Sequence, residues 1–215
     1  MSNIIFVSGI DTDAGKSYVT GVVARQLMEA GHRVITQKFI QTGNAGYSED
    51  INLHRLIMGT GMLPEDSRGL TAPIIFPFPA SAQLAARLAG REIDLELIDR
   101  STAALAERYD YVLIEGAGGL MVPITDTFTT IDYVASRHLP VMLVTNGRLG
   151  SINHTLLSLN ALSAHGIKIH SVAYNEHFDD EPTIAADTRA FLKRYLDRNH
   201  PQTPLTFIPS IRLSD

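Results

Sequence analysis

The 215-residue chain contains no cysteine. This absence excludes disulfides, thiolate zinc sites and cysteine nucleophiles together. It also fits a protein of a reducing compartment, because disulfides belong to oxidising ones. We therefore expect a cytoplasmic location.

Long apolar runs and positive charge are also scarce. No window reaches the roughly 20 consecutive apolar residues that a membrane span requires, and the first residues, MSNIIFVSG, lack the basic leader of a signal peptide. The formal net charge is −5, whereas nucleic-acid-binding domains are normally basic. Although a local basic patch is compatible with this charge, we expect no nucleic-acid and no membrane partner. Small molecules and other copies of the chain are the expected partners.

Histidine chemistry is not indicated either. The eight histidines show no spacing typical of metal ligands, and none stands beside a plausible nucleophile pair. His154 lies where a loop enters a helix and is interpreted as structural. The stretch 126–129, DTFT, is interpreted as a turn and a helix cap without chemistry of its own.

What the chain does contain is a series of short apolar runs rich in valine and isoleucine, at residues 4–7, 34–37, 111–114, 141–144 and 169–174. They do not alternate with polar residues, which is typical of parallel strands covered on both faces. Helical spacing follows at 16–30, 95–109 and 151–165, with Gly31 and Gly166 as stop signals. The region 71–80, with three prolines, is predicted to be an irregular loop or edge strand. Beyond residue 199, the spaced prolines predict a tail lying over the surface.

This order predicts an α/β fold: a doubly wound, mostly parallel sheet flanked by helices, with right-handed crossovers. Apolar residues make up 45% of the chain, enough for a packed core. No repeat, low-complexity segment or linker divides the sequence. We expect one domain over residues 1–215.

A glycine-rich loop stands directly after the first predicted strand, in the segment GIDTDAGKS at 9–17. Backbone N–H groups of such a loop converge on an anion, and the following helix adds its positive N-terminal end. Lys16 would reach the β- and γ-phosphates, while the Ser17 hydroxyl would bind Mg²⁺. Five residues separate Gly9 from Gly15, one more than in the usual phosphate loop. An ordinary strand–helix turn would explain the glycines, but not the Gly-Lys-Ser at the helix start.

Four further residues are candidates for the same site. Glu115 follows the strand at 111–114 and precedes GAGG; a carboxylate at such a strand end lies where open α/β sheets bind ligands. Lys38 ends the second strand, where it is either solvated or placed to stabilise phosphoryl transfer. Thr42 follows in the same loop. Asp50 begins a helix, as a cap or as a metal ligand. The helix start near 150–153 is a candidate carboxylate site.

Together these segments resemble the dethiobiotin synthetase family of P-loop enzymes. The resemblance rests on 9–17, whose extra residue is the family's own spacing, on Lys38 with 41–43, on 115–119, and on 123–129. It continues through 149–154, LGSINH, Asn175, and the Ile-Pro pair at 208–209. Over nearly the whole chain, the order and spacing of these pieces are specific.

The resemblance implies an ATP- and Mg²⁺-dependent cyclo-ligase of biotin biosynthesis that joins CO2 to 7,8-diaminononanoate. It implies a homodimer in which the substrate carboxylate meets the helix start of a second subunit. Lys16 and Lys38 would be catalytic, and Ser17, Asp50 and Glu115 would hold Mg²⁺. The implied substrate contacts are Thr12, Thr42, Gly150, Ser151, Ile152 and Asn153. The implied ATP contacts are Asp13, Ala14, Gly15, Lys16, Ser17, Tyr18, Asp50, Glu115, Gly116, Ala117, Gly118, Asn175, Glu176, Ile208, Pro209 and Ser210.

The chain departs from the family pattern in two places. Phe39 stands where proline is usual, and Ser17 replaces the commoner threonine while keeping the hydroxyl. The family's acid before the third helix matches Asp50 or Glu49, with Asp50 the better fit.

Three other functions compete with the synthetase. A partitioning or switch ATPase of the same branch typically has a lysine early in the loop, near Asp11, and the acid here argues against it. A small-molecule kinase would bring an arginine-rich lid, which we do not find. A related amidotransferase-type ligase without its glutaminase domain is the remaining alternative.

Overall fold

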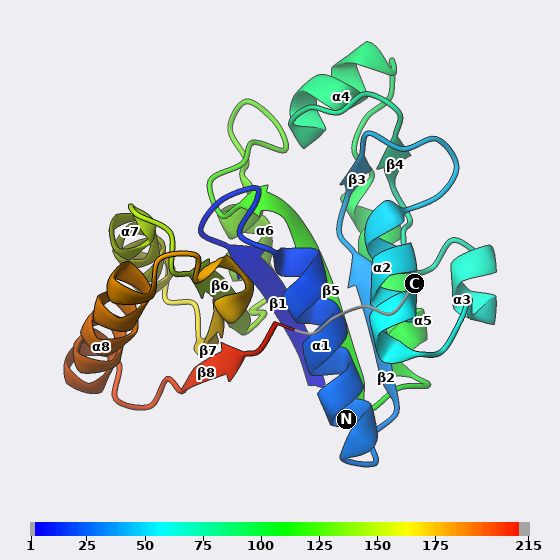
Figure 1. Cartoon of the computed structure of the whole chain (residues 1–215). Coiled ribbons are helices and arrows are strands. Elements are labelled where there is room, and N and C mark those ends of the chain that lie inside the picture. The colour runs from blue at the N-terminus through cyan, green and yellow to red at the C-terminus, as the bar shows by residue number, and fades with distance from the viewer. Residues whose placement is uncertain (1–2, 211–215) are drawn as a thin grey trace.

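The computed structural model describes residues 3–210 and contains a six-stranded parallel sheet with the order β2-β5-β1-β6-β7-β8. Figure 1 shows the sheet with helices on both sides. All five predicted strands are present, each longer by one to several residues. The strands are β1 (Asn3–Gly9), β2 (Val34–Lys38), β5 (Tyr111–Gly119), β6 (Val141–Asn146), β7 (Ile169–Asn175) and β8 (Leu205–Ile208).

The helices cover both faces of this sheet, so the predicted doubly wound α/β class is confirmed. In order they are α1 (Lys16–Glu29), α2 (Glu49–Met58), α3 (Pro64–Ser67), α4 (Ala82–Leu88), α5 (Leu95–Ala106), α6 (Thr130–Ser136), α7 (Ser151–Ala164) and α8 (Pro182–Asn199), with a 3₁₀ turn, η1 (Glu176–Phe178). The three predicted helices at 16–30, 95–109 and 151–165 correspond to α1, α5 and α7 and end one to three residues earlier.

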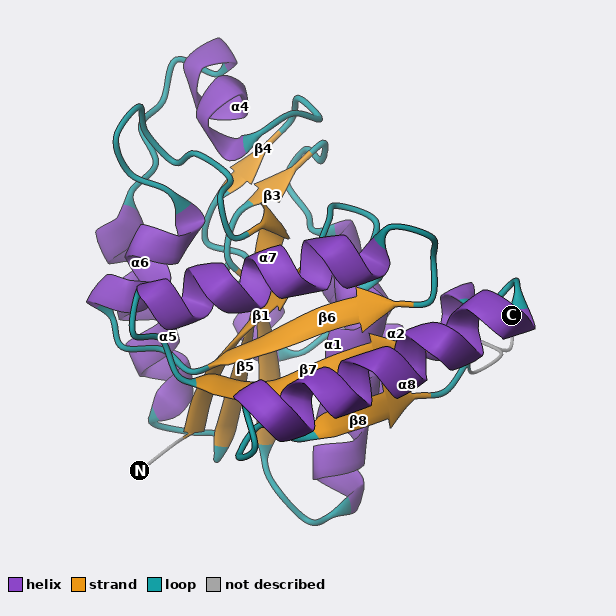
Figure 2. Cartoon of the chain, turned by 90° about the vertical axis from the view of Figure 1, so that its left-hand side faces the viewer, coloured by secondary structure: helices purple, strands orange, loops and turns teal. Residues whose placement is uncertain are grey.

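Strand periodicity divides the core into two layers. Ile5 and Val7 of β1 point toward α1 and α2, whereas Phe6 between them joins the cluster with α5, α6 and α7. A smaller cluster joins α8 to the same face through Leu159 and Leu196. Figure 2 shows α7 and α8 on the near side of β6, β7 and β8. Alternate residues of a strand face opposite sides, so a run without polar residues is needed to fill both layers.

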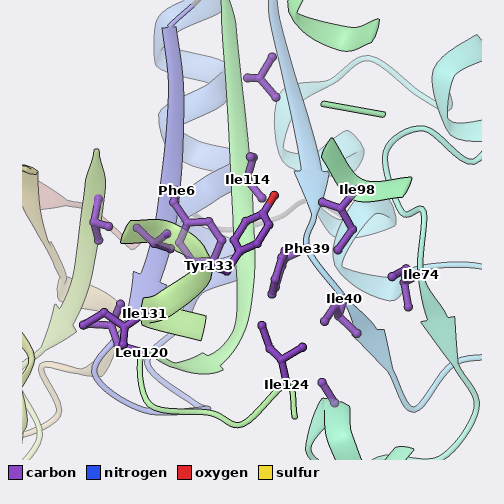
Figure 3. Close-up of a cluster of buried hydrophobic side chains, with 14 of the residues drawn as sticks. Phe6, Phe39, Ile40, Ile74, Ile98, Ile114, Leu120, Ile124, Ile131 and Tyr133 are labelled. Carbon is purple, nitrogen blue, oxygen red and sulfur yellow. The ribbon is translucent and has the colours of Figure 1, made fainter. Parts of the chain in front are cut away.

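The largest side chains of the core gather behind the sheet end that carries the phosphate loop. Phe6, Phe39 and Tyr133 form a three-ring cluster, with Phe39 and Tyr133 centroids 4.6 Å apart (Figure 3). All three are at most 1% exposed. Aromatic pairs in such tilted arrangements add to the gain from burial, so this end of the sheet is firmly packed.

A second, two-stranded parallel sheet projects beyond the end of β2 (Figure 1). It joins β3 (Gln41–Thr42) to β4 (Ile75–Phe76), with Thr42 opposite Phe76. The proline-rich region 71–80, predicted to be a loop or edge strand, therefore contains a short strand.

The C-terminal region differs from the prediction of a surface tail. Residues 205–208 form β8, which pairs parallel with β7 and closes that edge of the sheet. Pro204 and Pro209 flank the strand instead of interrupting it. Prolines outside a strand mark its ends without removing its hydrogen bonds, and this is why the proline spacing was misleading.

The described residues 3–210 contain the six-stranded and the two-stranded sheet; residues 1–2 and 211–215 of the expected single domain lie outside them. Within that described part, no helix combines the length and apolar character needed to cross a bilayer.

Candidate ATP-dependent active site

A cleft of about 500 Å³ opens at the carboxyl ends of β1, β2 and β5. This is the place where open α/β sheets bind ligands. Most of its walls come from residues that the sequence had singled out. The lining residues are Thr12, Asp13, Gly15, Lys16, Ser17, Tyr18, Lys38, Asp50, Leu53, Glu115, Gly118, Arg148 and Phe178.

The loop at 10–15 turns β1 into α1 and has the backbone that the glycine motif requires. Gly15 is the N-cap of α1 with φ 85°, a left-handed conformation that favours glycine. A Cβ at this position would also overlap the Asn175 side chain. The first N–H groups of α1 therefore face the cleft, where the helix end favours negative charge.

Lys16 lies folded along this loop. Its Nζ donates to the carbonyl oxygens of Asp11, at 2.9 Å, and Thr12, at 3.0 Å. Burial, together with repulsion from Lys38, lowers the pKa of Lys16 to about 8. Lys16 is 4% exposed, so an incoming anion would relieve an unfavourable buried charge.

Ser17, Asp50 and Glu115 converge beside it from three separate elements. The Ser17 hydroxyl lies 2.7 Å from Asp50 Oδ1 and 2.8 Å from Glu115 Oε1. Lys38 Nζ lies 2.6 Å from Asp50 Oδ2 and 2.8 Å from Glu115 Oε1. Ser17 and Lys38 therefore each contact both Asp50 and Glu115 within one small region.

The charges of Lys38 and Glu115 stabilise each other. Burial alone would disfavour both charged forms, but Glu115 and Asp50 more than offset it and raise the pKa of Lys38. Likewise burial opposes ionisation of Glu115, yet the Lys38 charge and a hydrogen bond from His54 bring its pKa well below the usual range. At neutral pH the cluster therefore contains an ammonium between two carboxylates.

The choice between Asp50 and Glu49 has a geometric answer. The helix α2 begins at Glu49, one residue earlier than expected, and its cap is the Ser48 hydroxyl, which accepts from the Ile51 N–H. Asp50 is therefore not the cap, and its carboxylate reaches Ser17 and Lys38. Glu49 is exposed, and its carboxylate lies 3.4 Å from the Tyr47 hydroxyl.

Phe39 has a clear structural role. Its ring packs in the three-ring cluster, and its backbone N–H donates to the Glu115 carbonyl oxygen at 2.8 Å. Proline at this position would lack that donor. The Phe39 N–H thus extends the hydrogen bonding between β2 and β5 by one residue beyond Lys38.

The residues expected near the base of ATP lie on the other side of the loop. The Tyr18 hydroxyl donates to the Pro209 carbonyl at 2.6 Å, and Asn175 Nδ2 approaches the Ala14 carbonyl at 3.4 Å. Asn175 faces Ile208 across the β7–β8 pairing, and Ser210 Oγ lies 3.2 Å from the His177 ring. Glu176 begins the η1 turn. Tyr18 lines the cleft, and the other residues lie outside its lining.

A smaller hollow of about 430 Å³ adjoins the cleft and shares Thr12 and Gly118 with it. Ala117 and the turn at 79–82 complete its walls. Gly116 lies behind, buried against Phe6. Thr42 is half-buried on β3 and lines neither space.

The helix start predicted as a carboxylate site is on the surface. Gly150 caps α7 with φ 97°, Asn153 is exposed and Ile152 is half-buried. Ser151 is turned inward, where its hydroxyl donates to Asn146 Oδ1 at 2.6 Å. None of these four residues lines the cleft of its own chain.

Sequence reasoning missed four residues of this region. Arg148 and Phe178 line the cleft and stack, with the guanidinium carbon 3.8 Å from the ring centroid. Leu53 lines it from α2, and His54 lies behind Glu115. The helical spacing from Asp50 to His54 places both on one face of α2, and this was the available signal for His54.

Comparisons with known proteins agree with this geometry. Residues 3–211 match the model of a family described as an AAA domain. The chain is 48% identical over 203 residues to the ATP-dependent dethiobiotin synthetase BioD 2 of Pasteurella multocida, covering 94% of this chain and 95% of that one. It is 53% identical over 175 residues to the protein of the same name from Haemophilus influenzae, covering 81% and 92%.

Among solved structures, the cobyrinic acid a,c-diamide synthase of Mycobacterium smegmatis with bound ADP and magnesium superposes with a TM-score of 0.53. It is 18% identical and covers 93% of this chain and 83% of that one, a likeness that concerns the fold alone. The family assignment rests on the much closer sequence relatives. With the phosphate loop, Lys38, Asp50 and Glu115 assembled in one cleft, the chain belongs to the ATP-dependent dethiobiotin synthetases.

Proposed function

We propose that the protein is an ATP- and Mg²⁺-dependent enzyme of biotin biosynthesis that converts 7,8-diaminononanoate and CO2 into dethiobiotin. The convergence of Lys16, Lys38, Ser17, Asp50 and Glu115 at one sheet edge supports this function most directly. The two close relatives, named as dethiobiotin synthetases over most of their length, support the same substrate chemistry.

In this proposal the loop at 12–17 holds the triphosphate with its backbone N–H groups, and Lys16 moves from the loop carbonyls to the β- and γ-phosphates. The adenine base is bound by Tyr18, Asn175, Glu176 and residues 208–210. The backbone of Ala117 and Gly118 and the hydroxyl of Thr12, which line the smaller hollow, contact the diamine, whereas Gly116 and Thr42 lie outside both spaces and are assigned no contact.

The donor set fits Mg²⁺, because a serine hydroxyl and two carboxylates supply the hard oxygen ligands that this ion prefers. Ser17, Asp50 and Glu115 would hold it. Among residues 3–210 no cluster of three or more His, Cys, Asp or Glu side chains forms a metal site, so phosphate oxygens and water would complete the shell. When bound, Mg²⁺ supplies positive charge against the β- and γ-phosphate oxygens.

The proposed reaction has three steps. One amine of the substrate adds to CO2 and loses a proton, which gives a carbamate. A carbamate oxygen attacks the γ-phosphorus while the bond to the ADP oxygen breaks, which gives a carbamic–phosphoric anhydride. The second amine adds to the carbamoyl carbon and loses a proton, phosphate leaves, and the cyclic urea closes.

Positioning and charge neutralisation are what these steps require from the protein. Lys38 is held by Asp50 and Glu115 in the wall of the cleft. In this role it contacts the carbamate and stabilises the negative charge on the migrating phosphoryl group. Lys16 stabilises the charge that remains on ADP.

The decisive experiment measures ATP turnover with 7,8-diaminononanoate and bicarbonate, and identifies the product by mass spectrometry. We expect ADP release to depend on both compounds and to be matched by one cyclic urea. ADP release that ignores the diamine would support a switch ATPase instead. Phosphorylation without ring closure would support a kinase.

The homodimer is part of this proposal. The start of α7 does not line its own cleft, so a second subunit would have to supply it to the substrate carboxylate. Exposed Leu157 and Met121, at 60 and 63%, line a groove between 119–123 and α7, and Leu149, just before α7, is 88% exposed. Burying such apolar residues favours association.

Sedimentation velocity at micromolar concentration tests the dimer, and we expect a species of twice the chain mass. Leu157→Glu should shift it to the monomer, whereas Leu56→Glu, at an equally exposed leucine on α2, should not. Monomers alone in the unmodified protein would remove the shared site.

A further inference from the structure

Behind Glu115, a chain of buried polar side chains runs away from the cleft into the core. His54 Nε2 lies 2.7 Å from Glu115 Oε2, and His54 Nδ1 lies 3.0 Å from Thr36 Oγ1. Arg55 donates to the same threonine oxygen at 2.8 Å. Glu115, His54 and Thr36 are 0% exposed and Arg55 is 2% exposed.

The far end of this chain is fixed. The Arg55 guanidinium donates to both carboxylate oxygens of Asp66, at 2.9 and 2.8 Å, and the Thr71 hydroxyl donates to Asp66 at 2.6 Å. A two-point arginine–carboxylate pair has a defined orientation. The Arg55 N–H that reaches Thr36 is therefore held in place.

Donor and acceptor roles along the chain follow from this fixed end. Arginine only donates, so Thr36 Oγ1 accepts from Arg55 and its own hydrogen is left for one acceptor. Within residues 3–210 the remaining partner of that hydroxyl is His54 Nδ1. Nδ1 then accepts, the ring hydrogen lies on Nε2, and Nε2 donates to Glu115. Every buried donor in this arrangement has an acceptor.

The two oxygens of the Glu115 carboxylate therefore contact different groups. Oε2 of Glu115 is engaged by His54, while Oε1 faces Ser17 and Lys38. Asp50 has no such support from the described part of the chain: its two oxygens contact Ser17 and Lys38, and its side chain is 24% exposed. Rotation of the Glu115 carboxylate would break the contact with His54.

We propose that His54 is a positioning residue that holds Glu115 with Oε1 toward the cleft and so sets the affinity for the divalent cation bound with the nucleotide. This inference rests on the proposed Mg²⁺ role of Glu115. In this role His54 acts through Glu115 and contacts neither the nucleotide nor the substrate. Partners that orient metal-binding carboxylates commonly contribute a factor of about 10 to 100 in metal affinity.

Nucleotide binding tests the proposal without needing the reaction. Calorimetry gives the Kd of ADP with excess Mg²⁺ and with EDTA. The Kd in EDTA divided by the Kd in Mg²⁺ is the ratio that measures the contribution of the metal to binding. For His54→Leu we expect this ratio to fall by about tenfold, while ADP binding in EDTA stays as in the unmodified protein. His54→Gln keeps an N–H donor for Glu115 and should restore most of the ratio.

His170→Leu is the matched control, because His170 is exposed at the opposite end of β7 from the cleft. It should leave the ratio unchanged. Thr36→Val should lower the ratio in the same direction as His54→Leu, since it leaves Nδ1 without its donor. If His54→Leu does not fold, the proposal is judged on His54→Gln and Thr36→Val.

An unchanged ratio in a folded His54→Leu, or a low ratio in His54→Gln, would overturn the role of His54 alone. An unmodified protein whose ADP affinity ignores Mg²⁺ would overturn it together with the metal site. A protein that is not a synthetase would be recognised in a different experiment, because the turnover assay with 7,8-diaminononanoate would yield no cyclic urea.

Discussion

Lys16 and Lys38 lie in the same cleft with nearly equal exposure, 4 and 5%, yet in opposite environments. Lys16 is surrounded by backbone carbonyls, and burial lowers its pKa to about 8. Lys38 lies between two carboxylates, which raise its pKa. The charge of Lys16 is therefore poorly compensated and would be stabilised by a bound anion. The charge of Lys38 is already balanced by Asp50 and Glu115.

The difference indicates a division of labour. An uncompensated ammonium gains most from binding phosphate, so Lys16 is suited to binding ATP. A compensated ammonium gains little from binding, but it stays charged and oriented while charge develops in the transition state. Arg148, exposed and stacked on Phe178, is a third cation on the rim. Three predictions separate these roles.

The largest effect is expected for Lys38→Ala. Turnover should fall on the order of 10² to 10³-fold, while the Kd of ATP, measured by calorimetry, changes by less than about tenfold. Lys193→Ala, at an exposed lysine of α8, is the control and should change neither quantity. Turnover within about tenfold of the unmodified protein, roughly 1.4 kcal/mol of barrier, would mean that Lys38 is not a main stabiliser of the transition state.

The second prediction concerns the pH dependence of nucleotide binding through Lys16. Phosphate binds the protonated amine, and this form is lost in the free protein as the pH rises through about 8. The affinity for ADP in EDTA should therefore be constant below pH 8 and fall above it, by at most about tenfold per pH unit.

Lys16→Arg separates the effect of this titration from a general loss of structure at high pH. Arginine stays charged over the whole range, so the variant should show a flat affinity between pH 7 and 9.5 even if it binds ADP more weakly. The same decline in both proteins would remove Lys16 as its cause.

The smallest effect is expected for Arg148→Ala. Arg148 is exposed, and its guanidinium donates to the Asp13 carbonyl of the loop at 3.3 Å and stacks on Phe178. An exposed cation–π contact is worth about 0.5 to 1 kcal/mol, so the Kd of ATP should rise by about two- to fivefold with turnover unchanged. A loss as large as that of Lys38→Ala would place Arg148 in the reaction itself.

Much of this site was predictable because its signals are local. Gly15, Lys16 and Ser17 stand where an apolar run gives way to a helix, so their roles follow from spacing alone. Lys38 and Glu115 end or follow apolar runs, and parallel strands bring such ends to one edge. The order of apolar runs and helices was likewise enough to predict the α/β class.

Other features are invisible to local patterns. His54 and Glu115 are 61 residues apart, and Lys38 and Glu115 are 77 apart. Their contact depends on β5 lying between β1 and β2, an order that no spacing of residues records. The strand at 205–208 was missed for a related reason: only its last residue is fully buried, and it becomes a strand by pairing with β7.

By itself, then, the sequence determined a parallel α/β sheet, a phosphate loop and a list of candidate acids and lysines, because strand, turn and helix preferences act over a few residues. The tertiary structure decided which of those candidates meet. It brought the Asp50 carboxylate into contact with Lys38, made Phe39 a donor to the Glu115 carbonyl and placed His54 behind the Glu115 carboxylate. These contacts join residues that are far apart in the chain. They depend on the order of the strands and on the burial of charges, which form only when the whole sheet packs.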